Sequence, residues 1–385
     1  VYIDIATKIF VRKISQNIMN NPFKFGSIVS GNYFTDRVEE QEKIGNIFNS
    51  ANHLALISPR RFGKTSLVNK VAKETGRTYI YVNLQEVVDV KDFATKIIKK
   101  TLETSFTEKF KYYISHLRFQ PTIDVDAVTG RTKVTLGAHV DDSEALEDAL
   151  SLINKIGANE PKNKPIVVFD EFQEINDIGK HLDKKLRSWM QMHEHVNYVF
   201  LGSQESMMEE IFENKKSPFY HFSLLMRLKR IPYNEFQAFL SNRFDLLCDD
   251  KETTDRVAHE ILEITECHPY YTQQLAYVVW DQWERKTNDT DALISMAIDT
   301  ITQSHSLDYE RLWEKFNRTD RRLLMLVANK RISAATPLQS ALTGIASQST
   351  AASCMKRLIK QGYIIKETFY SIDDPFFKNW INQIS

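Results

Sequence analysis

A short run of residues near position 60 has the composition of a phosphate-binding loop. An apolar stretch, Leu54–Ile57, leads into Gly63, Lys64 and Thr65, and a helix-compatible stretch comes next. In such loops backbone N–H groups and the positive end of the next helix surround a β-phosphate, a lysine reaches the β and γ oxygens, and a hydroxyl binds Mg²⁺. We therefore expect a nucleotide-binding segment made of Ser58, Pro59, Arg60, Arg61, Phe62, Gly63, Lys64, Thr65 and Ser66.

The loop departs from the pattern G-x-x-x-x-G-K-[ST] at its first position, where Ser58 replaces glycine. Taken alone, the segment could also be a basic strand-to-helix turn that contains Gly-Lys-Thr by chance. A second element is needed to choose between these interpretations.

That element is an apolar stretch, Ile166–Phe169, which ends in Asp170 and Glu171 and resembles a Walker B motif. Parallel strands open at their carboxyl ends into the ligand crevice, so Asp170 is predicted beside Mg²⁺ and Glu171 beside the attacking water. Such a strand end is usually only solvated, but after a phosphate-binding loop it indicates a nucleoside triphosphatase.

A third apolar stretch, Asn197–Gly202, ends in Ser203 and Gln204. Both side chains are polar and could contact the γ-phosphate or the attacking water. The alternative for each is a structural role in the turn after the strand.

The amino-acid composition excludes several classes of protein. The 385 residues, 42% of them hydrophobic, predict two or three domains with real cores and exclude a disordered chain. Fifty basic residues balance fifty acidic ones, so a nucleic-acid partner would need a local signal. The three cysteines lie far apart, which argues against zinc and disulfides. Without an apolar run of membrane-spanning length, we expect a cytoplasmic protein with no membrane partner.

The order of patterns predicts three consecutive parts. Strands alternate with helices up to residue 232, which predicts an α/β domain with a parallel sheet, interrupted by a hairpin around residues 122–136. Residues 233–303 read as a helical lid, and residues 304–385 as a winged helix. Residues 1–18 fit poorly with the rest of the chain and are interpreted as a possible extension.

The third part carries a local excess of positive charge. From Ser304 onward there are 12 Lys and Arg against 7 Asp and Glu. A short helix is expected at Pro337–Leu342 and a third helix at Ser347–Gln361, with Lys356, Arg357 and Lys360 as candidate phosphate contacts to DNA. The alternative is a winged helix that docks a protein and exposes this helix only to solvent.

Together these segments resemble the archaeal-type ATPase family of the STAND class, P-loop NTPases related to the origin-recognition AAA+ ATPases. The resemblance rests on the loop, the two strand-end motifs, Phe34–Glu39, His268–Tyr271 and Asp374–Trp380. It implies bound ATP, with adenine between the segment before Phe34 and the lid near Pro269, and a nucleotide-gated switch capable of oligomerising.

Two departures from the family bear on function. Where many relatives have an arginine, His221 and Phe222 stand here, so slow hydrolysis is expected unless Arg227 or Arg230 substitutes. The sequence also ends after the winged helix, so nucleic-acid cleavage is not expected. Two functions remain open: an ATPase switch that contacts double-stranded DNA, and a signalling ATPase whose winged helix docks a protein. A pseudoenzyme is disfavoured because the catalytic residues are complete.

Overall fold

The computed structural model describes residues 20–35, 37–104, 112–115, 117–119, 121–126, 132–137, 139–285, 290–330, 332–333, 348–366 and 368–385. They form two compact units. A helical unit comprises residues 20–35, 232–315 and 374–384, and the second unit comprises 37–231 and 316–373. The three consecutive ranges expected from the sequence stay a prediction. In this division residues 304–315 and 374–384 group with 232–303, and residues 316–373 group with 37–231.

The second unit contains a five-stranded sheet in the order β2-β5-β6-β1-β7. The strands are β1 (Leu54–Ile57), β2 (Tyr79–Asn83), β5 (Ile166–Asp170), β6 (Asn197–Gly202) and β7 (Leu224–Arg227), and all their pairings are parallel. Every residue of β1, β5 and β6 is buried, as continuous apolar strands of a parallel sheet require. The α/β fold with a parallel sheet is confirmed.

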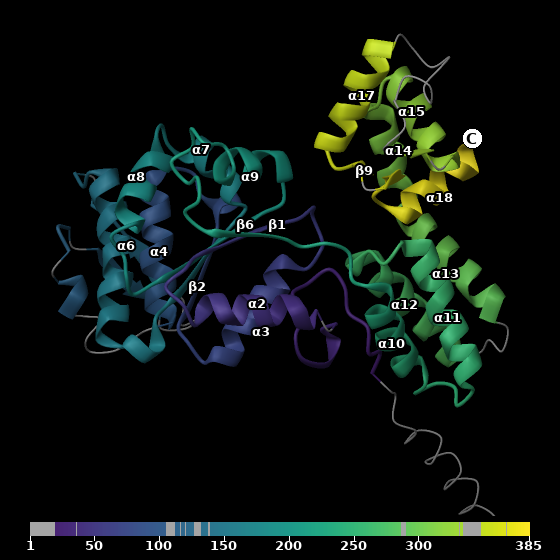
Figure 1. Ribbon diagram of the computed structural model, residues 1–385, viewed down its shortest axis with the longest axis horizontal. Coiled ribbons are helices and arrows are strands. Elements are labelled where there is room, and N and C mark those ends of the chain that lie inside the picture. The colour runs from purple at the N-terminus through teal and green to yellow at the C-terminus, as the bar shows by residue number, and fades with distance from the viewer. Residues whose placement is uncertain are drawn as a thin grey trace, which may run out of the picture. The chain divides into compact units, whose positions relative to one another are not determined.

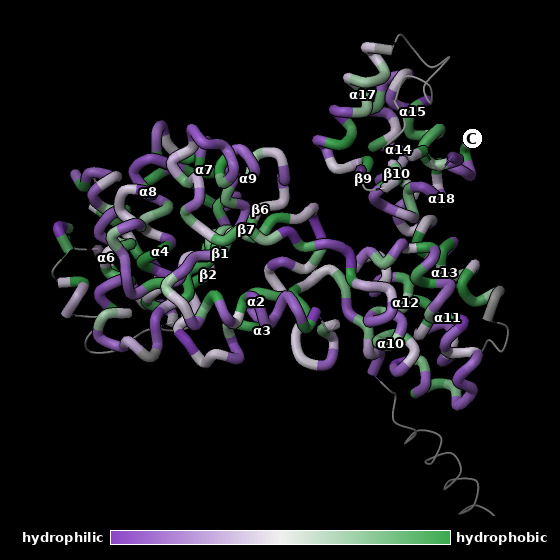
Figure 2. Tube along the Cα trace, viewed as in Figure 1, coloured by the Kyte–Doolittle hydropathy of each residue, from purple (hydrophilic) through white to green (hydrophobic). Residues whose placement is uncertain are grey.

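Helices cover this sheet (Figure 1). They are α2 (Val38–Phe48), α3 (Lys64–Thr75), α4 (Val90–Thr104), α6 (Asp142–Asn159), α7 (Ile175–Ile178), α8 (Leu182–Met190) and α9 (Glu205–Phe212). Helix α2 packs on α3, while α4 packs on α6 and β2. Short 3-10 turns occur at η2 (Leu84–Glu86), η3 (Pro161–Asn163) and η4 (Phe172–Glu174). Hydrophobic residues gather along the central strands and polar residues along the outer helix turns (Figure 2).

An aromatic cluster fills the core beside β6. The Phe200 ring lies 4.6 Å from that of Phe172, 5.3 Å from Phe212 and 5.6 Å from Phe219. All four side chains are at most 4% exposed. Tilted and edge-to-face aromatic pairs at these distances add to the stability gained by burial. The cluster fixes η4, which comes directly after Asp170 and Glu171.

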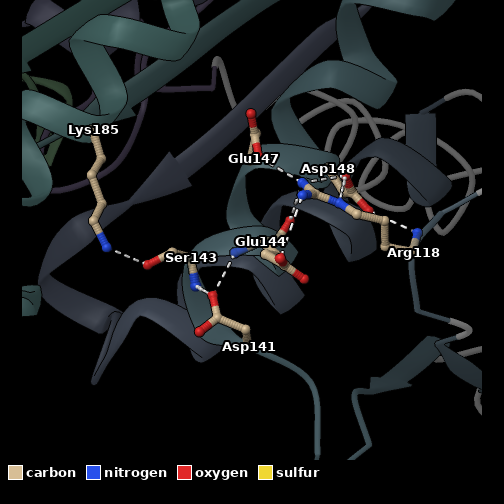
Figure 3. Close-up of polar contacts among 7 residues, drawn as sticks. All are labelled: Arg118, Asp141, Ser143, Glu144, Glu147, Asp148 and Lys185. Atoms are coloured by element: carbon tan, nitrogen blue, oxygen red, sulfur yellow. Dashed lines mark hydrogen bonds and ion pairs between the residues drawn. The ribbon is translucent and has the colours of Figure 1, made fainter.

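In the insertion between β2 and β5, the segment that contains Arg118 is held to α6 by ion pairs (Figure 3). The Arg118 guanidinium contacts the carboxylates of Glu147 at 2.6 Å and Asp148 at 2.8 Å, and that of Glu144 at 3.8 Å. Arg118 is 45% exposed, so each pair contributes little. The insertion also holds the antiparallel strands β3 (Thr122–Val125) and β4 (Thr132–Thr135) of the expected hairpin, whose turn lies outside the described residues.

The helical unit comprises α10 (Tyr233–Phe244), α11 (Lys251–Thr265), α12 (Pro269–Arg285), α13 (Thr290–Ser304), α14 (Ser306–Lys315) and α18 (Pro375–Ile384). The segment 20–35, with the 3-10 turn η1 (Gly31–Tyr33), crosses these helices. Its Phe23 ring is 1% exposed and lies 6.0 Å from Trp280. Helix α18 packs through Phe377, whose ring lies 5.2 Å from Tyr309 of α14.

Residues 316–373 combine helices with a small sheet. They contain α15 (Arg318–Asn329), β8 (Ile332–Ser333), α17 (Gln348–Lys360), β9 (Ile364–Lys366) and β10 (Phe369–Ile372), with the antiparallel order β8-β10-β9. The short helix expected at Pro337–Leu342 lies outside the described residues, as does Ser347. In the part of the chain that the structure describes, no helix is long and apolar enough to cross a membrane.

Two histidines are buried against β6. Nδ1 of His53 accepts a hydrogen bond from the Tyr198 backbone N–H at 3.2 Å, and His193 Nδ1 lies 2.6 Å from the Tyr198 hydroxyl. Burial lowers the pKa of His53 from 6.5 to about 4, with smaller effects from Arg187 and His193. Burial likewise lowers the pKa of His193 to about 4.

These histidines predict acid destabilisation. Between pH 6.5 and 4 the unfolded chain binds protons at these histidines that the folded protein does not bind. The free energy of unfolding therefore falls as pH falls through this window, by up to about 1.4 kcal/mol per pH unit for each histidine. Urea unfolding should show that His53→Gln, which keeps an acceptor, reduces the difference between pH 7 and pH 5. The exposed His221→Gln should leave it unchanged. An unaltered difference in His53→Gln would contradict the assignment.

Candidate active site

The phosphate-binding loop joins the end of β1 to the start of α3. Gly63 adopts a φ of 88°, which favours glycine, and Arg61 adopts a φ of 116°, which is strained for a residue with a side chain. Ser58 is not among the residues with positive φ, so a side chain is tolerated where the motif usually has glycine. The Ser58 N–H donates to the Gly202 carbonyl at 3.4 Å, which joins the ends of β1 and β6.

Lys64 is buried and bound to the loop itself. Its Nζ donates to the carbonyl oxygens of Ser58 at 2.8 Å and Pro59 at 3.0 Å, and to the Ser58 hydroxyl at 3.2 Å. Burial lowers the pKa of Lys64 from 10.5 to about 8, although Glu171, Asp170 and Glu205 oppose this shift. The ammonium group is thus still charged at neutral pH and is held where the loop begins.

Asp170 receives hydroxyl groups from two elements. Its Oδ2 accepts from Thr65 Oγ1 of α3 at 2.9 Å and from Tyr81 OH of β2 at 2.6 Å. Asp170 also lowers the acidity of Tyr81, whose pKa rises through burial and the neighbouring carboxylate. The structure therefore brings together Thr65 and Asp170, the two residues predicted to hold a metal.

Glu171 lies beside the end of β6. Its Oε2 accepts from Ser203 Oγ at 2.6 Å, from Ser203 N at 3.3 Å and from Gln173 Nε2 at 2.6 Å. Gln204 is instead the N-cap residue of α9, and its carbonyl accepts from the Met208 N–H. Of the two candidates after β6, only Ser203 contacts the predicted base within the described residues.

Three residues of this site escaped the sequence analysis: Tyr81, Gln173 and Arg37. Arg37 is 3% exposed, and its Nη2 donates to the carbonyls of Phe62 at 3.2 Å and Lys229 at 2.9 Å. It thereby ties the loop to the segment after β7. The available signals were an arginine inside Phe34–Glu39 and a glutamine two residues after Glu171, whereas no local signal marked Tyr81.

The remaining predicted loop residues differ in exposure. Arg60 and Arg61 are exposed, Pro59 is half-buried, and Phe62 and Ser66 are buried.

The other predicted site residues lie on separate elements. Arg227 contacts Glu213 at 2.7 Å and Glu209 at 3.0 Å, and Arg230 is half-buried. Pro269 is the first residue of α12 in the helical unit. Lys356, Arg357 and Lys360 are exposed on α17.

The family of ATPase domains predominantly from Archaea matches residues 34–275, a range that includes the loop and both strand-end motifs. The chain belongs to this family. The expected archaeal-type ATPase relationship is confirmed, and the protein is an ATPase of the P-loop type.

Solved structures support the same fold for this ATPase. A Walker-type ATPase of Pyrococcus abyssi is 16% identical with a TM-score of 0.62, and the match covers 91% of this chain and 96% of that one. The ORC2 protein of Aeropyrum pernix, solved as ADPNP and ADP complexes, is 14% identical with a TM-score of 0.54, covering 94% and 98%. No curated protein matches the ATPase.

We expect Lys64→Ala to abolish ATP binding by this ATPase. The variant loses the buried ammonium and its charge-assisted hydrogen bonds to phosphate, each worth about 1.5–3 kcal/mol, so affinity should fall roughly 100-fold or more. Titration calorimetry measures this loss. Lys73→Ala, an exposed lysine on the same helix, is the control and should bind normally. Wild-type affinity in Lys64→Ala would remove Lys64 from the site.

Proposed function

We propose that this ATPase is a nucleotide-operated switch in which ATP closes the helical lid and repositions a winged helix that contacts DNA. The observation that carries the catalytic part is the pair of contacts at the strand ends, Thr65 with Asp170 and Ser203 with Glu171. These contacts gather around Lys64 the oxygen groups that phosphoryl transfer to water requires.

In this proposal the side chains of the site have separate tasks. Lys64 leaves the carbonyls of Ser58 and Pro59 and binds the β and γ oxygens of ATP. Glu171 orients the attacking water and accepts its proton, and Ser203 contacts the γ-phosphate or that water.

Thr65 and Asp170 would hold Mg²⁺. A hydroxyl and a carboxylate 2.9 Å apart are hard oxygen donors that suit this ion, which binds nucleotides with few protein ligands. When bound, it neutralises charge on the phosphate oxygens. Among the described residues no group of three or more His, Cys, Asp or Glu side chains is arranged as a separate metal site.

We also propose that hydrolysis is slow. Arg227 is engaged by Glu209 and Glu213, and His221 and Phe222 provide no guanidinium. An arginine that stabilises the transition state contributes about 10³–10⁵ in rate, so the replacement at positions 221 and 222 limits turnover unless Arg230 or another molecule supplies a guanidinium.

Glu171→Gln should bind ATP but hydrolyse it much more slowly. The variant keeps a hydrogen-bonding side chain and the Lys64 clamp but loses the base, a change that typically costs about 10²–10⁴-fold in rate. Single-turnover hydrolysis with a parallel titration separates the two effects. Glu42→Gln, an exposed glutamate of α2, is the control. Unchanged turnover in Glu171→Gln would exclude this glutamate as the base.

The lid is the proposed transmitter of the nucleotide signal. The segment before Phe34 packs on α12, since Gln273 Nε2 donates to the Tyr33 carbonyl at 3.2 Å and the Phe25 ring lies 5.9 Å from Tyr270. In our proposal adenine binds between this segment and Pro269, so closure moves both together.

Residues 316–373 are the proposed output. Their helix and strand order is compatible with a winged helix, and α17 exposes Lys356, Lys360, Ser349 and Thr350. Arg357 is less able to bind a DNA phosphate than expected, because it forms an ion pair with the Asp320 carboxylate. Its side chain remains 46% exposed. We therefore propose DNA backbone contacts from the two lysines, with Arg357 as a structural residue.

The DNA proposal has a quantitative test. Two lysines that each neutralise one phosphate predict a slope of log affinity against log salt of about −2, and all three basic residues would give about −3. Lys356→Ala with Lys360→Ala should abolish most of this slope, whereas Lys330→Ala, an exposed lysine after α15, serves as control.

The second candidate is a signalling ATPase whose winged helix docks a protein. The internal use of Arg357 favours it, because this pair reduces the charge that α17 can offer to phosphates. The signalling function would replace the DNA proposal if this ATPase binds no DNA duplex at low salt with either ATP or ADP. It would also have to capture a protein partner through α17.

A further inference from the structure

Gln173 contacts the proposed base without having a role in the scheme above. It lies in η4 with a fully buried side chain, and its Nε2 donates to Glu171 Oε2 at 2.6 Å. Its second neighbour is Glu174 Oε1, at 3.5 Å. Since both neighbours are carboxylate oxygens, which only accept hydrogen bonds from an amide, the carboxamide must present its NH₂ group to them.

The other half of this carboxamide is unsatisfied. Gln173 Oε1 is buried and has no hydrogen-bond partner among the residues that the structure describes. A buried polar atom without a partner destabilises a fold, and an apolar side chain of similar size would avoid that cost. Stability of the core therefore does not account for glutamine at this position.

Glu171 is restrained from two directions. Gln173 approaches its Oε2 from η4, and the Ser203 hydroxyl and N–H approach the same oxygen from the end of β6. The Glu171 backbone is itself held at a φ of 53°, directly after β5. Within the described parts of the chain Oε1 forms no hydrogen bond, so the restraint leaves this oxygen available.

We propose that Gln173 is a positioning residue for ATP hydrolysis, which acts by fixing Glu171 through Oε2 so that Oε1 faces the attacking water. The inference rests on the proposed role of Glu171 as base. In the step, Oε1 takes one water proton while the water oxygen bonds to the γ-phosphorus and the bond to the bridging oxygen of ADP breaks. ADP and phosphate leave, and the proton passes to solvent.

Gln173→Met tests the role because it keeps the volume and removes the NH₂ donor. We expect kcat to fall about tenfold while KM and ATP affinity stay unchanged, and the melting temperature should stay equal or rise because the unpaired Oε1 is gone. Gln173→Glu should lower kcat further, since it places a carboxylate against Glu171. Gln191→Met, an exposed glutamine in the same unit, is the control for the substitution.

A double-mutant cycle separates positioning from packing. If Gln173 acts through Glu171, adding Gln173→Met to Glu171→Gln should not lower the single-turnover rate further. An equal tenfold loss in both backgrounds, or a fall in kcat that tracks a lower melting temperature, would overturn the inference. So would wild-type kcat in Gln173→Met.

The experiments distinguish failure of the proposed ATPase mechanism from failure of the role assigned to Gln173. If wild-type protein binds no ATP, or if Glu171→Gln hydrolyses ATP normally, the proposed function fails and this inference fails with it. If Glu171→Gln is impaired and Gln173→Met is not, only the role of Gln173 is lost.

Discussion

The carboxylate of Asp170 is the point on which the arrangement of the active site depends. It binds the hydroxyl of Thr65 at the start of α3 and that of Tyr81 in β2, and its Oδ1 accepts from the Glu171 N–H at 2.9 Å. The register of β2 and β5 pairs Tyr81 with Val168, so Tyr81 lies on the same face of the sheet as Asp170. The parallel register pairs Ile57 with Gly202, so the residues directly after β1 and β6 emerge side by side.

Electrostatics explain why this cluster is stable with Lys64 buried in it. Removal of an ammonium group from water disfavours its charged form, and burial accordingly outweighs the other influences on the pKa of Lys64. Asp170 and Glu171 offset part of this cost, and the loop carbonyls satisfy the N–H groups. A nucleotide that brings its own negative charge can therefore replace acceptors that the loop supplies, without exposing an unpaired cation.

The sequence indicated which residues stand in the loop and at the strand ends, and it missed a contact that depends on strand order. A shared metal for Thr65 and Asp170, and a phosphate or water contact for Ser203, were inferred from the loop pattern and from apolar strands with polar ends. The direct hydrogen bonds from Thr65 to Asp170 and from Ser203 to Glu171 were not predicted. Tyr81 could not be placed because nothing local shows that β2 is the neighbour of β5. Nothing in the sequence indicated that Arg357 pairs with Asp320 in place of a DNA phosphate, since this pairing depends on how α17 packs on α15.

The chain passes back and forth between the two units. The helical unit contains the residues before and after 37–231, and also those before and after 316–373. Each of these two stretches of the second unit is thus continuous with the helical unit at both of its ends. Neither stretch can therefore be removed by truncation from one end of the chain without also removing part of the helical unit.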